Sequence, residues 1–196
     1  RENESLTFIQ KSIELDPKDA GARYNLGNTL LKMGRLEEAK ASYTQAIKLD
    51  ATFFEAHNNL GNTLKELGRL EEAKASYTQA IKLKPDYSDA HNNLGNIFQE
   101  LGSLEASETS YNQAIALKPD YAEAHNNLGN TLQELGKLDE AEASYIQAIA
   151  FKSDYAEAHS NLGSVLLRKG RYREGLNEKR IGEGFISFDL KSGLST

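Results

Sequence analysis

The chain has 196 residues, a formal net charge of −6 at pH 7 and no cysteine. The negative charge argues against a nucleic acid partner, which favours a basic face, and the lack of cysteine excludes disulfides, thiolate metal ligands and thiol nucleophiles. No apolar run approaches the roughly 20 residues that span a bilayer, and no signal peptide is visible, so we expect no membrane partner and a cytoplasmic location. Because the first residue is Arg1, we expect the chain to begin inside a longer protein.

A stretch of 34 residues recurs along the chain. The heptapeptide AHNNLGN begins at Ala56, Ala90 and Ala124, and the variants ARYNLGN and AHSNLGS begin at Ala22 and Ala158. A fixed period of this length predicts an array of short units, each of which buries its apolar face only against its neighbours. The chain length therefore does not set the number of closed domains.

The predicted elements are all helical as far as this period extends. The first helix is predicted at residues 2–15, where Leu6, Ile9 and Ile13 have helical spacing. Each later unit has an opening helix and a following helix. The opening helices are predicted at residues 20–33, 54–67, 88–101, 122–135 and 156–169, and the following helices at residues 36–49, 70–83, 104–117 and 138–151.

The pattern decays after Gly170. One further helix is predicted within residues 171–184, residues 185–190 are strand-like in composition, and residues 191–196 are predicted to be a loop. Two interpretations stay open: this end is a frayed end or cap of the last unit, or it is a junction to a second domain.

Two sets of glycines explain the geometry of each unit. Gly68 and its equivalents follow the opening helices, where a left-handed residue commonly ends a helix, and the short link to the next helix predicts an antiparallel hairpin. Gly61 and its equivalents lie inside the opening helices, where glycine costs about 1 kcal/mol relative to alanine. We expect a close approach between helices to compensate for that cost.

The repeated columns resemble the tetratricopeptide repeat over about residues 20–170. In one full unit the matching residues are Leu60, Gly61, Gly68, Ala73, Tyr77, Ala80 and Pro85. The resemblance implies an all-α fold, a right-handed superhelical solenoid of antiparallel helix hairpins, whose opening helices line a concave groove. It also predicts a half repeat at residues 1–19, full units at 20–53, 54–87, 88–121 and 122–155, a divergent unit or cap at 156–184, and a tail or junction at 185–196.

Asparagines recur on one face of the opening helices, although asparagine is a mediocre helix former. An amide side chain offers a donor and an acceptor, which match the groups of a peptide backbone. The first asparagine of each motif is similar to the asparagine ladder in the tetratricopeptide region of O-linked N-acetylglucosamine transferase, which binds substrate peptide. The alternative is that these side chains are solvated or bond neighbouring helices. The candidate peptide-binding asparagines are Asn25, Asn28, Asn59, Asn62, Asn93, Asn96, Asn127, Asn130 and Asn161.

Carboxylates lie on the same face. Glu66, Glu100 and Glu134 lie near the ends of their helices, where the helix dipole disfavours negative charge, so we include them in the candidate site and expect a neutral or basic, extended partner. Acidic residues near the helix starts either complement the dipole or contact a ligand. The middle units lack the basic residues of the carboxylate-clamp subclass of tetratricopeptide domains, so we reject that specificity.

One histidine per unit raises the possibility of a metal site. Packed helices lie roughly 8–10 Å apart and zinc bonds are about 2 Å long, so two of these histidines can hardly share a metal. We expect them to pack in interfaces, and we predict no metal and no cofactor. They are His57, His91, His125 and His159.

No nucleophile and base stand out from the repeat, so no catalytic residue is predicted. The leading hypothesis is a protein-interaction scaffold that binds a peptide in the groove. Two alternatives stay open: a homo-oligomer that assembles through uncapped terminal repeats, and a substrate-selecting region of a larger enzyme such as a transferase.

Overall fold

The structure is a computed structural model that describes residues 2–184. The expectations for residues 185–190 and 191–196 lie outside the described residues. Within residues 2–184 the regular structure consists of eleven α-helices and no strand. The predicted all-α class is therefore confirmed.

The helices follow one another with short connections. The first helix is α1 (Glu2–Leu15). The opening helices are α2 (Ala20–Lys32), α4 (Phe54–Glu66), α6 (Ser88–Glu100), α8 (Ala122–Glu134) and α10 (Ala156–Arg168). The following helices are α3 (Leu36–Leu49), α5 (Leu70–Leu83), α7 (Leu104–Leu117), α9 (Leu138–Phe151) and α11 (Tyr172–Gly182). The predicted opening helices each end one residue earlier in the structure, because the last predicted residue is the C-cap.

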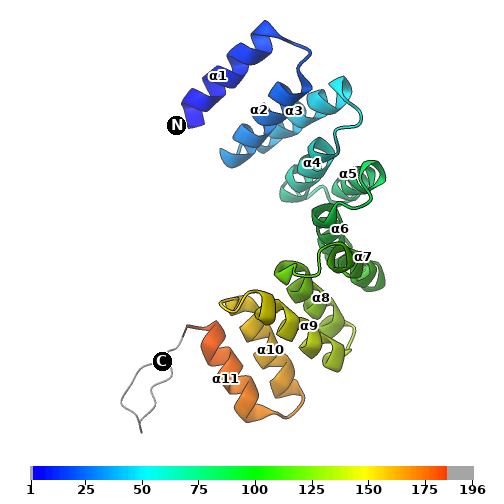
Figure 1. Ribbon diagram of the computed structural model, residues 1–196, viewed down its shortest axis with the longest axis vertical. Coiled ribbons are helices and arrows are strands. Elements are labelled where there is room, and N and C mark those ends of the chain that lie inside the picture. The colour runs from blue at the N-terminus through cyan, green and yellow to red at the C-terminus, as the bar shows by residue number, and fades with distance from the viewer. Residues whose placement is uncertain (1, 185–196) are drawn as a thin grey trace. The chain divides into compact units, whose positions relative to one another are not determined.

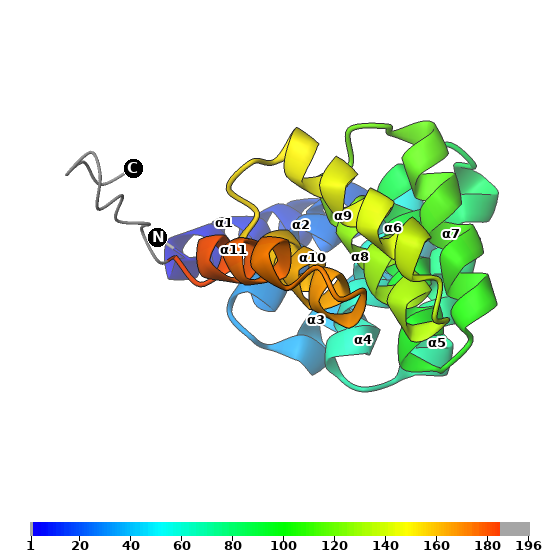
Figure 2. The ribbon, with the colours of Figure 1, turned by 90° about the horizontal axis from the view of Figure 1, so that it is seen from below.

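The chain divides into two compact units, Arg1–Leu101 and Gly102–Thr196. In the first unit, α2 packs on α3 and α4 on α5 as hairpins, while α1 lies against α2 and α6 against α5 (Figure 1). In the second unit, α8 packs on α9 and α10 on α11, while α7 lies against α8. Figure 2 shows the α10–α11 hairpin from a second direction. Contacts within each unit join helices that are neighbours in sequence or one helix apart, as expected for an array.

Glycine forms the turn of every hairpin. Gly34 has a φ of 71°, a left-handed conformation that a residue with a Cβ rarely adopts. The amide of the next residue, Arg35, then donates to the carbonyl of Leu30 over 2.9 Å, which satisfies one of the free carbonyls at the helix end. Equivalent glycines have φ values from 72° to 77°. The predicted role of these glycines is confirmed.

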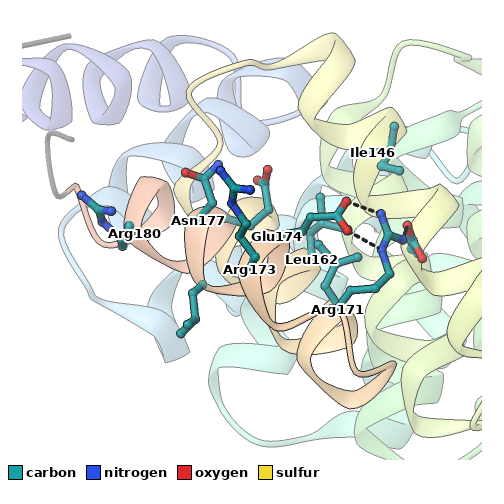
Figure 3. Close-up of a pocket in the computed structure, with 11 residues that line it drawn as sticks. Ile146, Leu162, Arg171, Arg173, Glu174, Asn177 and Arg180 are labelled. Carbon is teal, nitrogen blue, oxygen red and sulfur yellow. Dashed lines mark hydrogen bonds and ion pairs between the residues drawn. The ribbon is translucent and has the colours of Figure 1, made fainter. Parts of the chain in front are cut away.

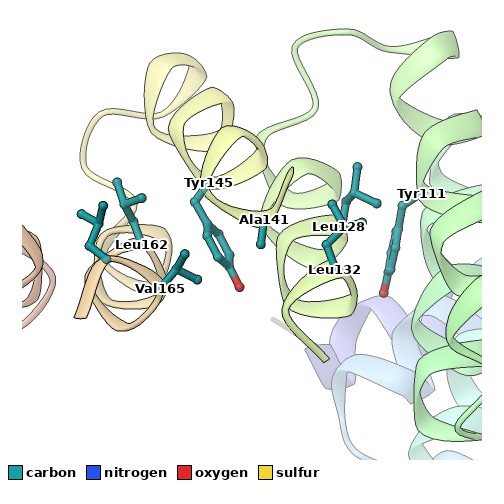
Figure 4. Close-up of a cluster of buried hydrophobic side chains, with 8 residues drawn as sticks. Tyr111, Leu128, Leu132, Ala141, Tyr145, Leu162 and Val165 are labelled. Carbon is teal, nitrogen blue, oxygen red and sulfur yellow. The ribbon is translucent and has the colours of Figure 1, made fainter. Parts of the chain in front are cut away.

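A tyrosine from the following helix fills the centre of the hairpins α2–α3, α4–α5 and α8–α9. The rings of Tyr43, Tyr77 and Tyr145 are fully buried. Figure 4 shows Tyr145 with other side chains of its buried hydrophobic cluster. A Cβ added to Gly61 would lie 2.6 Å from the ring of Tyr77. The expected close approach of helices is therefore found in a different form at these hairpins, because the missing side chain makes room for an aromatic ring rather than for a helix backbone. In the α10–α11 hairpin, by contrast, two glycines meet, Gly163 and Gly175.

Candidate functional site

The candidate asparagines all lie on opening helices and are at least partly exposed. Asn25 is exposed, and the other eight members of the set are partly exposed. Each AHNNLGN motif also has an asparagine outside the candidate set, directly after the histidine. These residues, Asn58, Asn92 and Asn126, are buried, with at most 4% of their surface exposed. Each of these motifs therefore holds one buried asparagine beside two that solvent can reach.

Hydrogen bonds between amides connect successive repeats. The Nδ2 group of Asn93 donates to Oδ1 of Asn58 over 3.1 Å and to Oδ1 of Asn62 over 3.2 Å. In the second unit, Asn161 donates in the same way to Asn126 over 3.1 Å and to Asn130 over 3.0 Å. The partners are 35 and 31 residues earlier in the chain, so each amide is bonded to the preceding repeat.

The first repeat has a variant of this arrangement. Asn59 donates to Oδ1 of Asn28 over 2.9 Å and to the hydroxyl of Tyr24 over 3.0 Å. Tyr24 stands in the motif position that Asn58 has in the next repeat. A tyrosine hydroxyl can accept a hydrogen bond as an amide oxygen does, so the contact between repeats is kept.

The buried tyrosines extend the network into the hairpin core. Tyr43, Tyr77 and Tyr145 donate their hydroxyl hydrogens to Oδ1 of Asn28, Asn62 and Asn130 over 2.7 to 2.8 Å. Burial raises the pKa of all three hydroxyls above the usual tyrosine range, so they remain donors at neutral pH. Asn28, Asn62 and Asn130, each the last asparagine of its motif, thus accept one bond from their own hairpin and one from the next repeat.

These contacts decide between the two interpretations of the asparagines only in part. Bonding between neighbouring helices is real, because both Nδ2 hydrogens of Asn59, Asn93 and Asn161 are used within the chain. The Oδ1 atoms of Asn93 and Asn161, by contrast, have no hydrogen-bond partner among the described residues. Every unpartnered polar atom of the described side chains remains accessible to solvent. We call the side of the opening helices that carries the candidate asparagines the asparagine face. Two side-chain carbonyl oxygens on this face can therefore accept a hydrogen bond from a bound molecule.

The three acidic candidates lie beside this network. The negative charges of Glu100 and Glu66 contribute to the raised pKa of Tyr77, after the larger effect of burial, and Glu134 contributes to that of Tyr145. Glu100 also forms an exposed ion pair with Lys65, whose Nζ lies 3.1 Å from the carboxylate. Near the helix starts, Glu157 accepts a hydrogen bond from Nδ2 of Asn126 over 3.1 Å.

The histidines hold the turns between repeats. Nε2 of His91 lies 3.0 Å from the carbonyl of Pro85, and Nε2 of His125 lies 2.9 Å from that of Pro119. His159 makes the equivalent bond to Ser153 and places Nδ1 2.6 Å from Glu178. Among residues 2–184 no three potential metal ligands gather in one place.

Profiles of known families match most of the chain. The profile described as TPR repeat matches residues 27–68, 61–102, 95–136 and 133–170, and one described as Tetratricopeptide repeat matches residues 8–41. The chain belongs to the tetratricopeptide repeat family. None of the curated protein sequences compared with it matches.

Several solved structures have the same tetratricopeptide fold. A crystal structure of YrrB, described as a TPR protein with an unusual peptide-binding site, is 25% identical, with a TM-score of 0.73, and the match covers 90% of this chain and 91% of that one. A crystal structure of MamA is 24% identical over 82% of this chain and 94% of that one, with a TM-score of 0.75. PilF of Pseudomonas aeruginosa is 18% identical over 90% and 82%, with a TM-score of 0.79. The fold predicted for this tetratricopeptide chain is confirmed.

No helix among the described residues is both long and apolar enough to cross a bilayer.

Sequence reasoning missed the buried asparagines Asn58, Asn92 and Asn126, although the AHNNLGN motif displays them. Their signal was their recurrence in the three AHNNLGN motifs, which the neighbouring asparagines share.

Proposed function

We propose that this chain is a protein-interaction scaffold that binds an extended peptide segment along the asparagine face of its opening helices. Tetratricopeptide repeat proteins generally mediate protein–protein interactions, and scaffolds of this kind are typically without enzymatic activity. The observation that carries the proposal is the pair of solvent-accessible, unpartnered Oδ1 atoms on Asn93 and Asn161. Such an oxygen accepts a backbone N–H of a bound peptide, while the amide that carries it is fixed by two bonds to the preceding repeat.

Because these amides are already held in place by hydrogen bonds, their side chains lose less conformational entropy when a peptide binds. A single hydrogen bond contributes only about 0.5–1.5 kcal/mol, so affinity depends on several repeats acting together. Glu66 and Glu134 add negative charge beside the amides, so a neutral or basic peptide fits the face better than an acidic one.

A peptide library selection tests this function. The wild-type chain is expected to enrich peptides that lose affinity when the chain carries Asn93→Ala and Asn161→Ala, or when the backbone nitrogens of the peptide are methylated. Asn112→Ala serves as the matched control, because Asn112 is an exposed asparagine on the following helix α7 and does not belong to the candidate site. Enriched peptides that bind the double variant as tightly as wild type, at a temperature where both are folded, would refute the proposal.

A second candidate function is self-association through α1. Phe8 and Leu15 are 75% and 81% exposed on this helix, and exposed large apolar side chains favour contact with another chain. Light scattering over a dilution series should show dimers that Phe8→Ser with Leu15→Ser removes. A monomer at every concentration would exclude this candidate.

A further inference from the structure

A second surface lies in the C-terminal unit, between α9 and α11 and above α10. These helices enclose a groove of about 1000 Å³ (Figure 3). Its floor contains Leu162 and Leu166, and its walls carry Ile146 from α9 and Leu176 from α11, which are 46% and 56% exposed. The groove therefore offers apolar surface within reach of a partner side chain.

Each carboxylate of the groove already has a partner. Glu142 bonds to Lys169 over 2.5 Å and also to Arg171, and Glu174 bonds to Arg171. Glu178 lies 2.6 Å from Nδ1 of His159. Glu142 and Glu174 are therefore paired with cations, whereas the contact of Glu178 is an ion pair only when His159 is protonated.

Two of the three guanidinium groups in the groove are not paired. Arg173 and Arg180 line it with their side chains exposed, and neither has an ion pair or hydrogen bond among the described residues. They are seven residues apart on α11, which places them on one side of the helix about 10.5 Å apart along its axis. Figure 3 shows them on either side of Asn177. The groove thus presents two positive charges without a partner among the described residues, although the chain as a whole carries −6.

This charge is a property of α11 and not of the repeat. The following helices α3, α5, α7 and α9 each have an acidic residue at the position equivalent to Arg173. At the position equivalent to Arg180 each has an uncharged residue. The equivalent residues are Glu37, Glu71, Glu105 and Asp139 for the first position, and Thr44, Thr78, Asn112 and Ile146 for the second. Repetition of the unit alone therefore does not account for the two arginines.

We propose that this groove binds an acidic segment of a partner protein, with two carboxylates about 10 Å apart that pair with Arg173 and Arg180 and an apolar side chain between them that contacts Leu176 and Ile146. Charge complementarity argues for this occupant. The chain's own residues 185–196 contain a single acidic side chain, Asp189, two residues from Lys191, so they do not supply two carboxylates. The site involves the α9–α11 groove and does not depend on the asparagine face.

Fluorescence anisotropy with a labelled synthetic peptide tests the proposal. The probe is a helical peptide with two glutamates seven residues apart and two leucines between them. Two control peptides replace both glutamates with glutamine or both leucines with serine. The full chain is expected to bind the probe at least about tenfold more tightly than either control, and added salt is expected to weaken binding.

Variants assign the binding to the two arginines. Arg173→Gln with Arg180→Gln should weaken binding of the probe about tenfold, while Arg168→Gln, an exposed arginine of α10 that does not line the groove, should leave it unchanged. Thermal unfolding of each variant confirms that it is folded.

Three results would overturn the proposal. The first is equal affinity for the probe and its glutamine control, and the second is unchanged affinity in the double variant. The third is assignment to another occupant: displacement of the probe by a peptide of residues 185–196, or a dimer of the chain that the double variant dissociates.

Discussion

Asn62 shows how one side chain can join two repeats. Its Oδ1 atom accepts a hydrogen bond from Tyr77 of its own hairpin over 2.7 Å and another from Asn93 of the next repeat over 3.2 Å. An amide oxygen has two lone pairs, so both bonds are satisfied at once. We therefore expect these asparagines to contribute to the stability of the chain.

Replacing Asn93 with alanine should destabilise the chain by about 1–3 kcal/mol, because it removes two bonds and leaves the buried acceptor of Asn58 unsatisfied. Urea denaturation followed by circular dichroism measures the change. The exposed Asn25 provides the comparison, and Asn25→Ala should have little effect, since its side chain has no partner among the described residues. Equal stability of the two variants would contradict the proposed role of the network.

His57 should make stability depend on pH. Burial lowers its pKa below the usual value of 6.5, and this effect exceeds the opposing hydrogen bond to the backbone of Ala51. A lowered pKa in the folded chain means that the unfolded chain binds the proton more readily. The stabilisation is therefore complete above about pH 6.5 and is lost as the pH falls through the folded-state pKa.

Denaturation at about pH 7.5 and about pH 5.5 measures this effect. The free energy of unfolding of wild type should fall further over this interval than that of His57→Gln, which cannot titrate. Identical pH dependence in the two chains would show that His57 does not contribute.

At the scale of the helix, the fit between Gly61 and Tyr77 sets the packing of a hairpin. Gly61→Ala raises helix propensity by about 1 kcal/mol, yet the new Cβ would lie 2.6 Å from the Tyr77 ring. Overpacking of this kind costs typically 1–3 kcal/mol, so we expect net destabilisation. In a double-mutant cycle with Tyr77→Leu, the two effects should not add, because the smaller side chain relieves the clash. Strict additivity would contradict this account.

The helices were predictable because their signals are local. Periodic leucines, turn glycines and the recurrence of each column place the opening and following helices to within one residue of their bounds in the structure. The asparagine contacts were not predictable, because they join residues 31 and 35 apart and depend on how successive helices pack. The α9–α11 groove was missed for the same reason: its lining comes from three helices, and the sequence analysis treated residues 171–184 as a decayed repeat.

At the scale of the whole chain, contacts between neighbours imply unequal local stability. Among the described residues α1 packs only on α2, whereas α4 packs on α2, α3, α5 and α6. Hydrogen exchange should therefore be fastest in the amides of α1 and much slower in those of α4. Uniform protection along the chain would indicate a single cooperative unit instead.

The 34-residue register of the amide contacts also affects how the gene can change. Each set of amide contacts crosses one repeat boundary and joins one donor position of the later motif to the same two acceptor positions of the earlier motif. Deleting or duplicating 34 residues within the array therefore brings equivalent partners together again. Recombination between repeats can therefore shorten or lengthen this protein without leaving a buried amide unbonded.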